Sequence, residues 1–163
     1  MELDLIKYEL DEEIKRQLDS ILSRFINKTK ADLVVLCDDA GRVASYEGSE
    51  KDENEIEFIA SLVSGIFGAA AEMAKLMHEG DVLDIVQYES KNVNVLIKSV
   101  GKRFLVGVLS PKTASLGSIR LFLKELCIDL ETLFRGVKLR PAKVIRLRPE
   151  DIERKLNQVL GAG

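Results

Sequence analysis

The spacing of apolar residues changes along the chain, and each spacing predicts a different element. Over residues 4–27 the apolar positions recur every three or four residues, which predicts an amphipathic helix. These positions are Leu10, Ile14, Leu18, Ile21, Leu22 and Phe25. A similar periodicity predicts a long helix over about 55–78 and another over about 116–134, with Thr113 or Ser115 as its N-cap. A short fourth helix is predicted over 150–160, just before Gly161.

Shorter apolar runs predict five strands. Residues 32–37 have the continuous apolar run LVVLC at their centre, which is typical of a strand buried on both faces. The turn residues 38–42 connect it to a returning strand over 43–47, and further strands are predicted over 82–89, 92–100 and 103–109. Gly101 and Lys102 predict a two-residue hairpin, because glycine tolerates a positive φ. Such tight connections predict a mainly antiparallel sheet and the α+β fold class.

The long helix over 55–78 has two unlike faces. Its broad apolar face is predicted to cover the sheet and comprises Ile56, Ile59, Leu62, Val63, Ile66, Phe67, Ala70, Met73, Ala74 and Met77. The opposite side, here called the small face, carries mostly small residues: Ser61, Ser64, Gly65, Gly68, Ala71, Glu72 and Lys75. Each mid-helix glycine costs about 1 kcal/mol relative to alanine. Close approach of another backbone explains that cost, although a well-packed helix can also simply tolerate two glycines.

Charge divides the chain into two parts. Residues 1–134 carry 16 basic and 24 acidic side chains, whereas residues 135–163 carry eight basic and three acidic ones. The sequence therefore predicts a globular domain over 1–134 and a basic C-terminal extension over 135–163. The basic residues could contact phosphates or an acidic partner, or could simply be solvated. The negative charge of the domain disfavours a broad nucleic-acid surface, so no nucleic-acid partner is expected.

Composition limits the chemistry that the chain can perform. With 163 residues, 46% of them hydrophobic and 31% charged, it suits a soluble globular domain. One histidine, His78, and two cysteines, Cys37 and Cys127, are too few for a standard zinc site or a disulfide framework. We therefore expect no metal, no other cofactor and a reducing compartment. The longest apolar run, over 58–71, predicts no membrane span, and the N-terminal pattern predicts no signal peptide.

Sequence motifs of self-contained enzymes are absent. The chain contains no GxxxxGK[ST], GxSxG, HExxH or CxxC pattern. Asp38 and Asp39 could act as paired carboxylates, but the sequence DDAGR favours a hairpin turn. Cys37 and Cys127 are interpreted as small core residues and not as a redox pair. The sequence favours a protein that acts by binding over an enzyme.

Three stretches resemble the Roadblock family of the dynein light-chain type, especially its bacterial and archaeal MglB branch. They are ADLVVLCDDAGRVAS, IASLVSGIFGAAAEMAKLM and LSPKTASLGSIRLFLKEL, and the resemblance covers about residues 5–134. It implies an α/β/α sandwich around a five-stranded antiparallel sheet with the profilin-like Roadblock topology. It also implies a homodimer through the strand at 82–89 and the helix at 55–78, which makes a continuous ten-stranded sheet.

The resemblance further implies a partner and a mechanism. MglB-type dimers bind MglA, a small Ras-like GTPase, and stimulate its GTP hydrolysis, so the small face is the expected binding surface. That face has no arginine to donate, which favours reshaping of the GTPase's own switch over an arginine finger. The extension is expected to steer an acidic partner surface through Lys138, Arg140, Lys143, Arg146 and Arg148.

Two alternatives stay open beside a cytoplasmic regulator of polarity or motility. A Roadblock scaffold or adaptor would bind partners without affecting GTP hydrolysis, with the basic extension as a tether. A sensor of small ligands is disfavoured because the sequence shows no convergent polar residues that would line a pocket.

Overall fold

The computed structural model describes residues 3–8, 11–135, 141–147 and 149–160. Contacts divide the chain into two compact units. We call residues 11–137 the main unit, and residues 1–10 together with 138–163 the terminal unit. The sequence-based division at 134/135 differs from this one by leaving the first ten residues with the globular domain.

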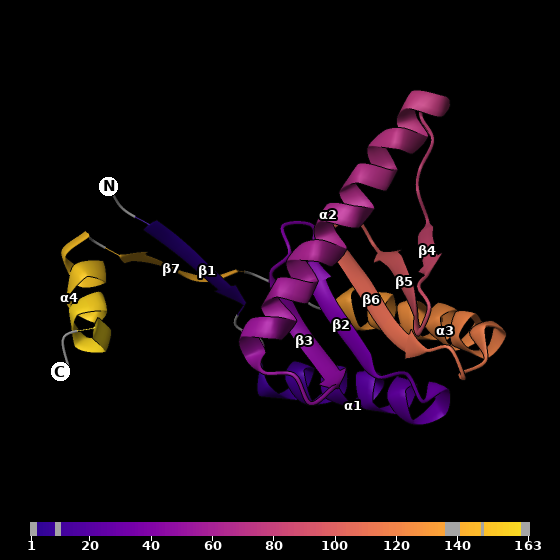
Figure 1. The fold of residues 1–163 in the computed structure, drawn as a ribbon, viewed down its shortest axis with the longest axis horizontal. Coiled ribbons are helices and arrows are strands. Elements are labelled where there is room, and N and C mark those ends of the chain that lie inside the picture. Colours follow the sequence, from indigo (N-terminus) through magenta and orange to yellow (C-terminus); the bar gives the residue numbers. More distant parts are fainter. Residues whose placement is uncertain (1–2, 9–10, 136–140, 148, 161–163) are drawn as a thin grey trace. The chain divides into compact units, whose positions relative to one another are not determined.

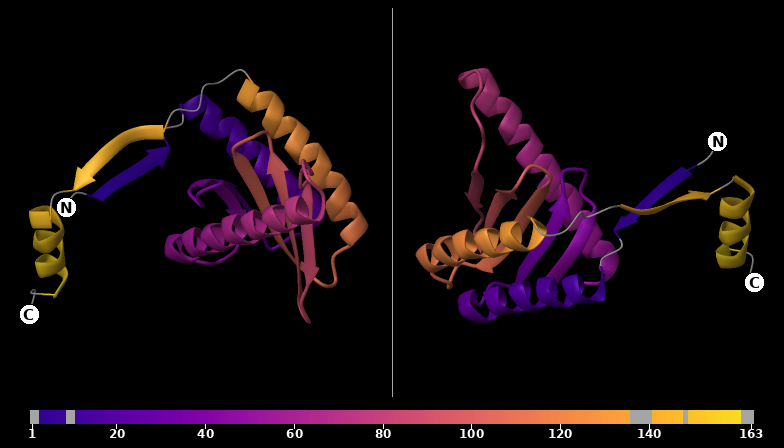
Figure 2. Two further views of the ribbon diagram at one scale, coloured as in Figure 1. Left: turned by 90° about the horizontal axis from the view of Figure 1, so that it is seen from above. Right: turned by 180° about the vertical axis from the view of Figure 1, so that it is seen from behind.

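The main unit has a five-stranded antiparallel sheet between two layers of helices (Figure 1). Its elements are α1 (Glu12–Thr29), β2 (Leu33–Asp38), β3 (Val43–Gly48), α2 (Glu53–Met77), β4 (Ile85–Glu89), β5 (Val93–Val100), β6 (Phe104–Pro111) and α3 (Leu116–Arg135). The strand order is β3-β2-β6-β5-β4, and every pairing is antiparallel. Helix α2 covers one face of the sheet, and α1 and α3 cover the other (Figure 2). The predicted α/β/α fold is confirmed.

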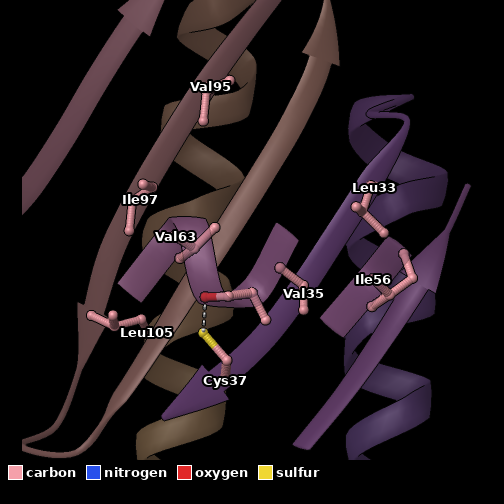
Figure 3. Packing of buried hydrophobic residues seen from close by; sticks show 9 residues of the cluster. Leu33, Val35, Cys37, Ile56, Val63, Val95, Ile97 and Leu105 are labelled. Atoms are coloured by element: carbon pink, nitrogen blue, oxygen red, sulfur yellow. Dashed lines mark hydrogen bonds between the residues drawn. The ribbon is translucent and has the colours of Figure 1, made fainter. Parts of the chain in front are cut away.

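Strand β2 is buried along its whole length, as the apolar run predicted. Leu33, Val35 and Cys37 pack with α2 residues in the core cluster shown in Figure 3. Val34 and Leu36, which alternate with them and so lie on the other face, are also fully buried. Burial of a Val or Leu side chain contributes about 1.5–3 kcal/mol, so this strand fixes both helix layers to the sheet.

Two glycines let α2 lie close to the sheet and to the β2–β3 turn. A Cβ at Gly107, on the central strand β6, would lie 2.8 Å from Val63 Cγ2 and 3.2 Å from Val35 Cγ1. A Cβ at Gly41 would lie 2.8 Å from the Ser61 Cα, and Gly41 also has a φ of +80°. Both separations are too short for a side chain, so these positions require glycine.

The N-terminal helix predicted over 4–27 is wrong at its start. Residues 3–8 form a strand, β1 (Leu3–Tyr8), and α1 begins only at Glu12, with Asp11 as N-cap. The helical periodicity is correct where it describes the buried residues Leu18, Leu22 and Phe25. The alternating sequence LDLIKY instead pairs with a strand from the C-terminal end, a long-range partner that local spacing does not reveal.

Two other local predictions need correction. The β5–β6 hairpin has three loop residues, 101–103, because Val100 pairs with Phe104. Gly101 has the expected positive φ of +60°. The strand predicted over 82–89 begins at Ile85, whose Cα partner on β5 is Lys98. The N-cap prediction for α3 holds for Ser115, whose Oγ accepts from the Ser118 N–H at 3.3 Å.

The terminal unit consists of elements from both ends of the chain. Strand β1 pairs antiparallel with β7 (Pro141–Leu147), and α4 (Pro149–Leu160) follows within two residues. The helix agrees with the short one predicted over 150–160. The strand β7 was not predicted.

Candidate functional site

The small face forms one continuous row along α2. From Ser61 to Lys75 its residues repeat an i, i+3, i+4, i+7 pattern, so they span about 21 Å of helix. Ser61, Gly65, Gly68, Glu72 and Lys75 are exposed, and the other two residues are half-buried. The structure therefore brings all seven predicted residues to one side of the helix.

The N-terminal end of this row contacts the β2–β3 turn of the same chain. Ser64 Oγ donates to the Asp39 carbonyl oxygen at 2.7 Å. Gly41, in the same turn, lies against the Ser61 backbone as described above. This is one close backbone approach of the kind that the small residues predicted, and it comes from within the chain.

Gly65 and Gly68 are different, because the space that a side chain would occupy at each position is open. A Cβ built at either position meets no heavy atom within 4 Å outside the local helix backbone. Their cost of about 1 kcal/mol each is therefore not offset by packing against the described part of the chain. The open backbone at these two positions is available to another molecule.

The C-terminal end of the row is charged. Lys75 Nζ and Glu72 Oε1 form an exposed ion pair at 3.3 Å, one helical turn apart. Exposed pairs of this kind contribute less than about 1 kcal/mol to folding. Breaking this ion pair costs little, so both side chains can form new contacts with groups of a partner protein.

A second row of α2, beside the small face, is apolar and exposed. It consists of Phe58, Leu62, Met73, Leu76 and Met77. Leu62, Met73 and Met77 were predicted to cover the sheet, and this part of the prediction is wrong. The buried residues Ile56, Ala60 and Val63 all lie in the N-terminal half of α2. The C-terminal half extends beyond the sheet, which leaves Leu76 and Met77 85% and 87% exposed (Figure 1).

Helix α2 is long and apolar enough to cross a membrane, judged by length and composition alone. It is the one such helix among the described residues. Its N-terminal half packs against the sheet through the core cluster of Figure 3. The absence of a membrane span stays a prediction.

The β2–β3 turn is a feature whose structural role the sequence prediction missed. Asp38 is completely buried, and its carboxylate accepts from the Ala40 N–H, the Arg42 N–H and the Arg42 Nε–H, at 3.0, 2.8 and 2.5 Å. The turn interpretation of DDAGR is confirmed, since the Gly41 N–H donates to the Asp38 carbonyl oxygen at 3.0 Å. The sequence DDAGR was the available signal for the turn. The packing of the turn on α2 could not be inferred from these neighbouring residues.

The predicted extension residues lie partly outside the described residues. Lys138, Arg140 and Arg148 fall in undescribed positions, whereas Lys143 and Arg146 lie on β7. The register of the terminal sheet places Arg146 opposite Asp4 of β1.

The described residues contain no group of three or more His, Cys, Asp or Glu side chains that could hold a metal ion. Burial raises the pKa of both Cys37 and Cys127 from 9.0 to about 12, and the neighbouring Asp38 carboxylate adds to the effect at Cys37. Thiols with such pKa values are protonated at neutral pH and are poor nucleophiles. Cys37 Sγ lies 3.9 Å from the Ala60 carbonyl oxygen in the core. A dashed line at Cys37 marks this contact in Figure 3.

The main unit thus combines an antiparallel sheet between two helix layers with an exposed row of small residues on α2. The chain belongs to the Roadblock/LC7 domain family, whose model matches residues 17–110. A curated relative from Aquifex aeolicus (strain VF5), described as an uncharacterized protein, is 39% identical over 162 residues, which is 99% of this chain and all of that protein.

Solved MglB structures share the fold. The gliding protein MglB from Thermus thermophilus superposes with a TM-score of 0.72 and 20% identity, covering 80% of this chain and 97% of its own. Myxococcus xanthus MglB has a TM-score of 0.69 and 25% identity, covering 74% of this chain and 97% of its own. The described fold is therefore that of the MglB-like Roadblock proteins.

Proposed function

We propose that this protein is a homodimeric regulator that binds a small Ras-like GTPase of the MglA type and stimulates its GTP hydrolysis. The observation that carries the proposal is the open backbone at Gly65 and Gly68 on α2. A flat switch segment of a GTPase can approach this backbone more closely than a helix with ordinary side chains would allow. The similarity of the fold to MglB proteins supports a partner of this type.

The proposed mechanism is indirect. Helix α2 contains no arginine, and the cation of the small face is Lys75, which pairs with Glu72. An arginine finger from this face is therefore not available, although such a finger is the usual external contribution to GTP hydrolysis. We infer that the dimer instead holds the switch in a conformation in which the GTPase's own residues reach the nucleotide.

The homodimer is proposed to form at the β4 edge of the sheet. Strand β4 pairs with β5 on one side, and its other side is an open edge in the described main unit. The C-terminal part of α2 and the connection that leads to β4 expose Met73, Leu76, Met77 and Val82. An open strand edge and exposed apolar side chains both favour pairing with a second copy. The two small faces would then contribute to one binding surface.

The basic residues of the extension are proposed to act at longer range. Lys138, Arg140, Lys143, Arg146 and Arg148 would attract an acidic partner surface and raise the association rate. This contribution should weaken with added salt, because screening acts within about 10 Å at 0.1 M ionic strength. We place the protein in the cytoplasm, in control of polarity or motility, as the gliding function in the name of the Thermus neighbour suggests.

The decisive experiment is GTP turnover by an MglA-type GTPase from the same genome, with and without two equivalents of this protein. A rise of tenfold corresponds to about 1.4 kcal/mol of barrier lowering and would support the activator. GTP-dependent binding without a rise would contradict activation and support a scaffold or adaptor. The absence of both would contradict the proposed partner.

The scaffold alternative is favoured by the small face itself, which carries no arginine to contribute to hydrolysis. Removal of the terminal unit, leaving residues 11–137, separates the two functions. Loss of cellular localisation with unchanged GTPase stimulation would assign the terminal unit a tethering role.

A further inference from the structure

The β5–β6 hairpin carries two neighbouring cations in its loop. Lys102 and Arg103 are both exposed, and neither forms an ion pair within the part of the chain that the structure describes. By contrast, Lys98 on strand β5 pairs with Asp84 at 2.6 Å. The two hairpin charges can therefore bind groups of another molecule without first breaking such a pair.

The hairpin lies next to the N-terminal end of the small face, with the β2–β3 turn between them. Ser64 Oγ on α2 donates to the Asp39 carbonyl oxygen at 2.7 Å, and the Asp39 N–H donates to the Arg103 carbonyl oxygen at 3.1 Å. Two successive hydrogen bonds through Asp39 thus join α2 to the hairpin backbone. The small face and the two cations border the same turn.

The hairpin is also fixed at both ends of its loop. The Gly101 N–H donates to Glu131 Oε1 on α3 at 3.3 Å, and Val100 pairs with Phe104 where the loop closes. The ring centroids of Phe104 and Phe134 lie 5.0 Å apart, which anchors the start of β6 to α3. Because the loop backbone is held in place, a partner that binds here does not have to order it first.

The charge beside the small face differs in sign from that of the main unit as a whole. Residues 11–137 carry 16 basic and 21 acidic side chains. Along the small face, Glu72 and Lys75 form a neutral pair. At the neighbouring end of the sheet, the two hairpin cations outnumber the exposed carboxylate of Asp39, and Glu131 lies on α3 in the helix layer of the other face. A positive border on an acidic unit favours a partner that presents carboxylates at this place.

We propose that the partner surface continues from the small face onto the β5–β6 hairpin, where Lys102 and Arg103 bind carboxylate side chains beside the switch of the GTPase. This inference rests on the proposed function, because the occupant is the same GTPase. The planar Arg103 guanidinium can hold a carboxylate through two parallel hydrogen bonds, and Lys102 adds a compact cation on a flexible stem. The small face accommodates the backbone of the partner, and the hairpin selects its charge.

The test compares two double charge reversals of the full chain that change the net charge equally. Lys102→Glu/Arg103→Glu reverses the hairpin cations. The matched control, Lys91→Glu/Lys124→Glu, reverses two exposed cations that likewise have no ion pair among the described residues, one at the opposite end of β5 and one on α3. Stopped-flow fluorescence measures association with a GTP-bound MglA-type GTPase from the same genome, at about 0.02 M and about 0.5 M salt.

The hairpin variant should associate about tenfold or more slowly than the control at low salt, and the difference should shrink at high salt. The neutral variant Lys102→Gln/Arg103→Gln should give an intermediate rate. At saturating concentration the hairpin variant should stimulate GTP hydrolysis as fully as the wild type, because the two cations act in binding and not in the reaction.

Two results would overturn the proposal while leaving the proposed function intact. Equal association rates of the hairpin variant and the control would show that the hairpin does not contact the partner. A lower maximal turnover with the hairpin variant would show that Arg103 acts on the reaction itself. Wild-type protein that neither binds nor stimulates the GTPase would instead contradict the proposed function and this extension of it together, so the two failures are distinguishable.

Discussion

Ser64 on α2 and Asp39 in the β2–β3 turn are joined by a hydrogen bond of 2.7 Å from the hydroxyl to the backbone carbonyl. This bond links the row of small residues to a turn that is itself fixed by the buried Asp38 carboxylate. The proposed binding surface therefore has a rigid boundary at its N-terminal end.

Replacement of Ser64 tests this link. Ser64→Ala should lower the free energy of unfolding by about 0.5–1.5 kcal/mol, because the Asp39 carbonyl loses its donor. Ser61→Ala is the matched control, since the Ser61 hydroxyl donates only to the Glu57 carbonyl within the same helix, at 3.0 Å. The control should be neutral or slightly stabilising. Urea denaturation of both variants measures the difference, and equal values would show that the link is unimportant.

A bulky charge on the small face should abolish partner binding. Gly68→Arg places a long cationic side chain where nothing lies within 4 Å, so the fold should be unaffected. Gly117→Arg, at an equally open position on α3, controls for the added charge. Titration calorimetry with the GTP-bound partner should detect binding by the control and not by Gly68→Arg. Full binding by Gly68→Arg would show that the partner binds at a surface other than the small face.

The same glycines should reveal a conflict between stability and binding. Gly65→Ala and Gly68→Ala should each raise the free energy of unfolding by about 1 kcal/mol, because alanine is the better helix former and has room at both positions. Partner affinity should fall in the same variants, since the added methyl keeps the partner from the helix backbone. A gain in stability without loss of affinity would mean that the glycines serve no contact.

Gly107 differs from Gly65 and Gly68, because a Cβ has no room at this position. Gly107→Ala should destabilise the protein by about 1–3 kcal/mol, because its Cβ would lie 2.8 Å from Val63 Cγ2. Val63→Ala removes that methyl group, so the double variant should be more stable than the sum of the two single losses predicts. Thermal unfolding of the four proteins in this cycle measures the coupling. Strict additivity would contradict the close contact.

The two thiols should be unreactive in the folded protein. Cys37 and Cys127 have pKa values raised by burial to about 12, so an alkylating reagent at pH 8 should label them only after denaturation. Below the unfolded pKa of about 9 the thiols are protonated in both states and do not affect stability. As the pH rises from about 9 towards 12, the unfolded chain loses these protons first, and stability falls. Rapid labelling of the native protein at pH 8 would contradict this burial.

The main fold could be predicted from sequence because its signals are local. The apolar run of β2, the small residues of α2 and the DDAGR turn each specify one element through neighbouring residues. The pairing of Leu3 with Leu147 could not be found in this way, since its partners are separated by almost the whole chain. The helical spacing from Leu10 onward led to a helix prediction that included the residues of β1.

The candidate site was predicted only in part for a similar reason. The spacing on α2 identifies which residues share a face, but it does not show where the sheet ends. Leu62, Met73 and Met77 were therefore assigned to the core, although α2 extends beyond the strands that would have covered them. Likewise, Gly41 and Gly107 carry no signal of what lies opposite them.

The terminal sheet also sets an order of events during synthesis. Strand β1 is synthesised before the main unit, yet its partner β7 is made only after it. The main unit can thus fold while β1 is still unpaired, with an exposed edge and apolar residues on it. Because its contacts span almost the full chain length, the terminal unit is the last part to form, and an incomplete chain lacks it. Only a chain that has been synthesised through β7 can form the paired terminal sheet.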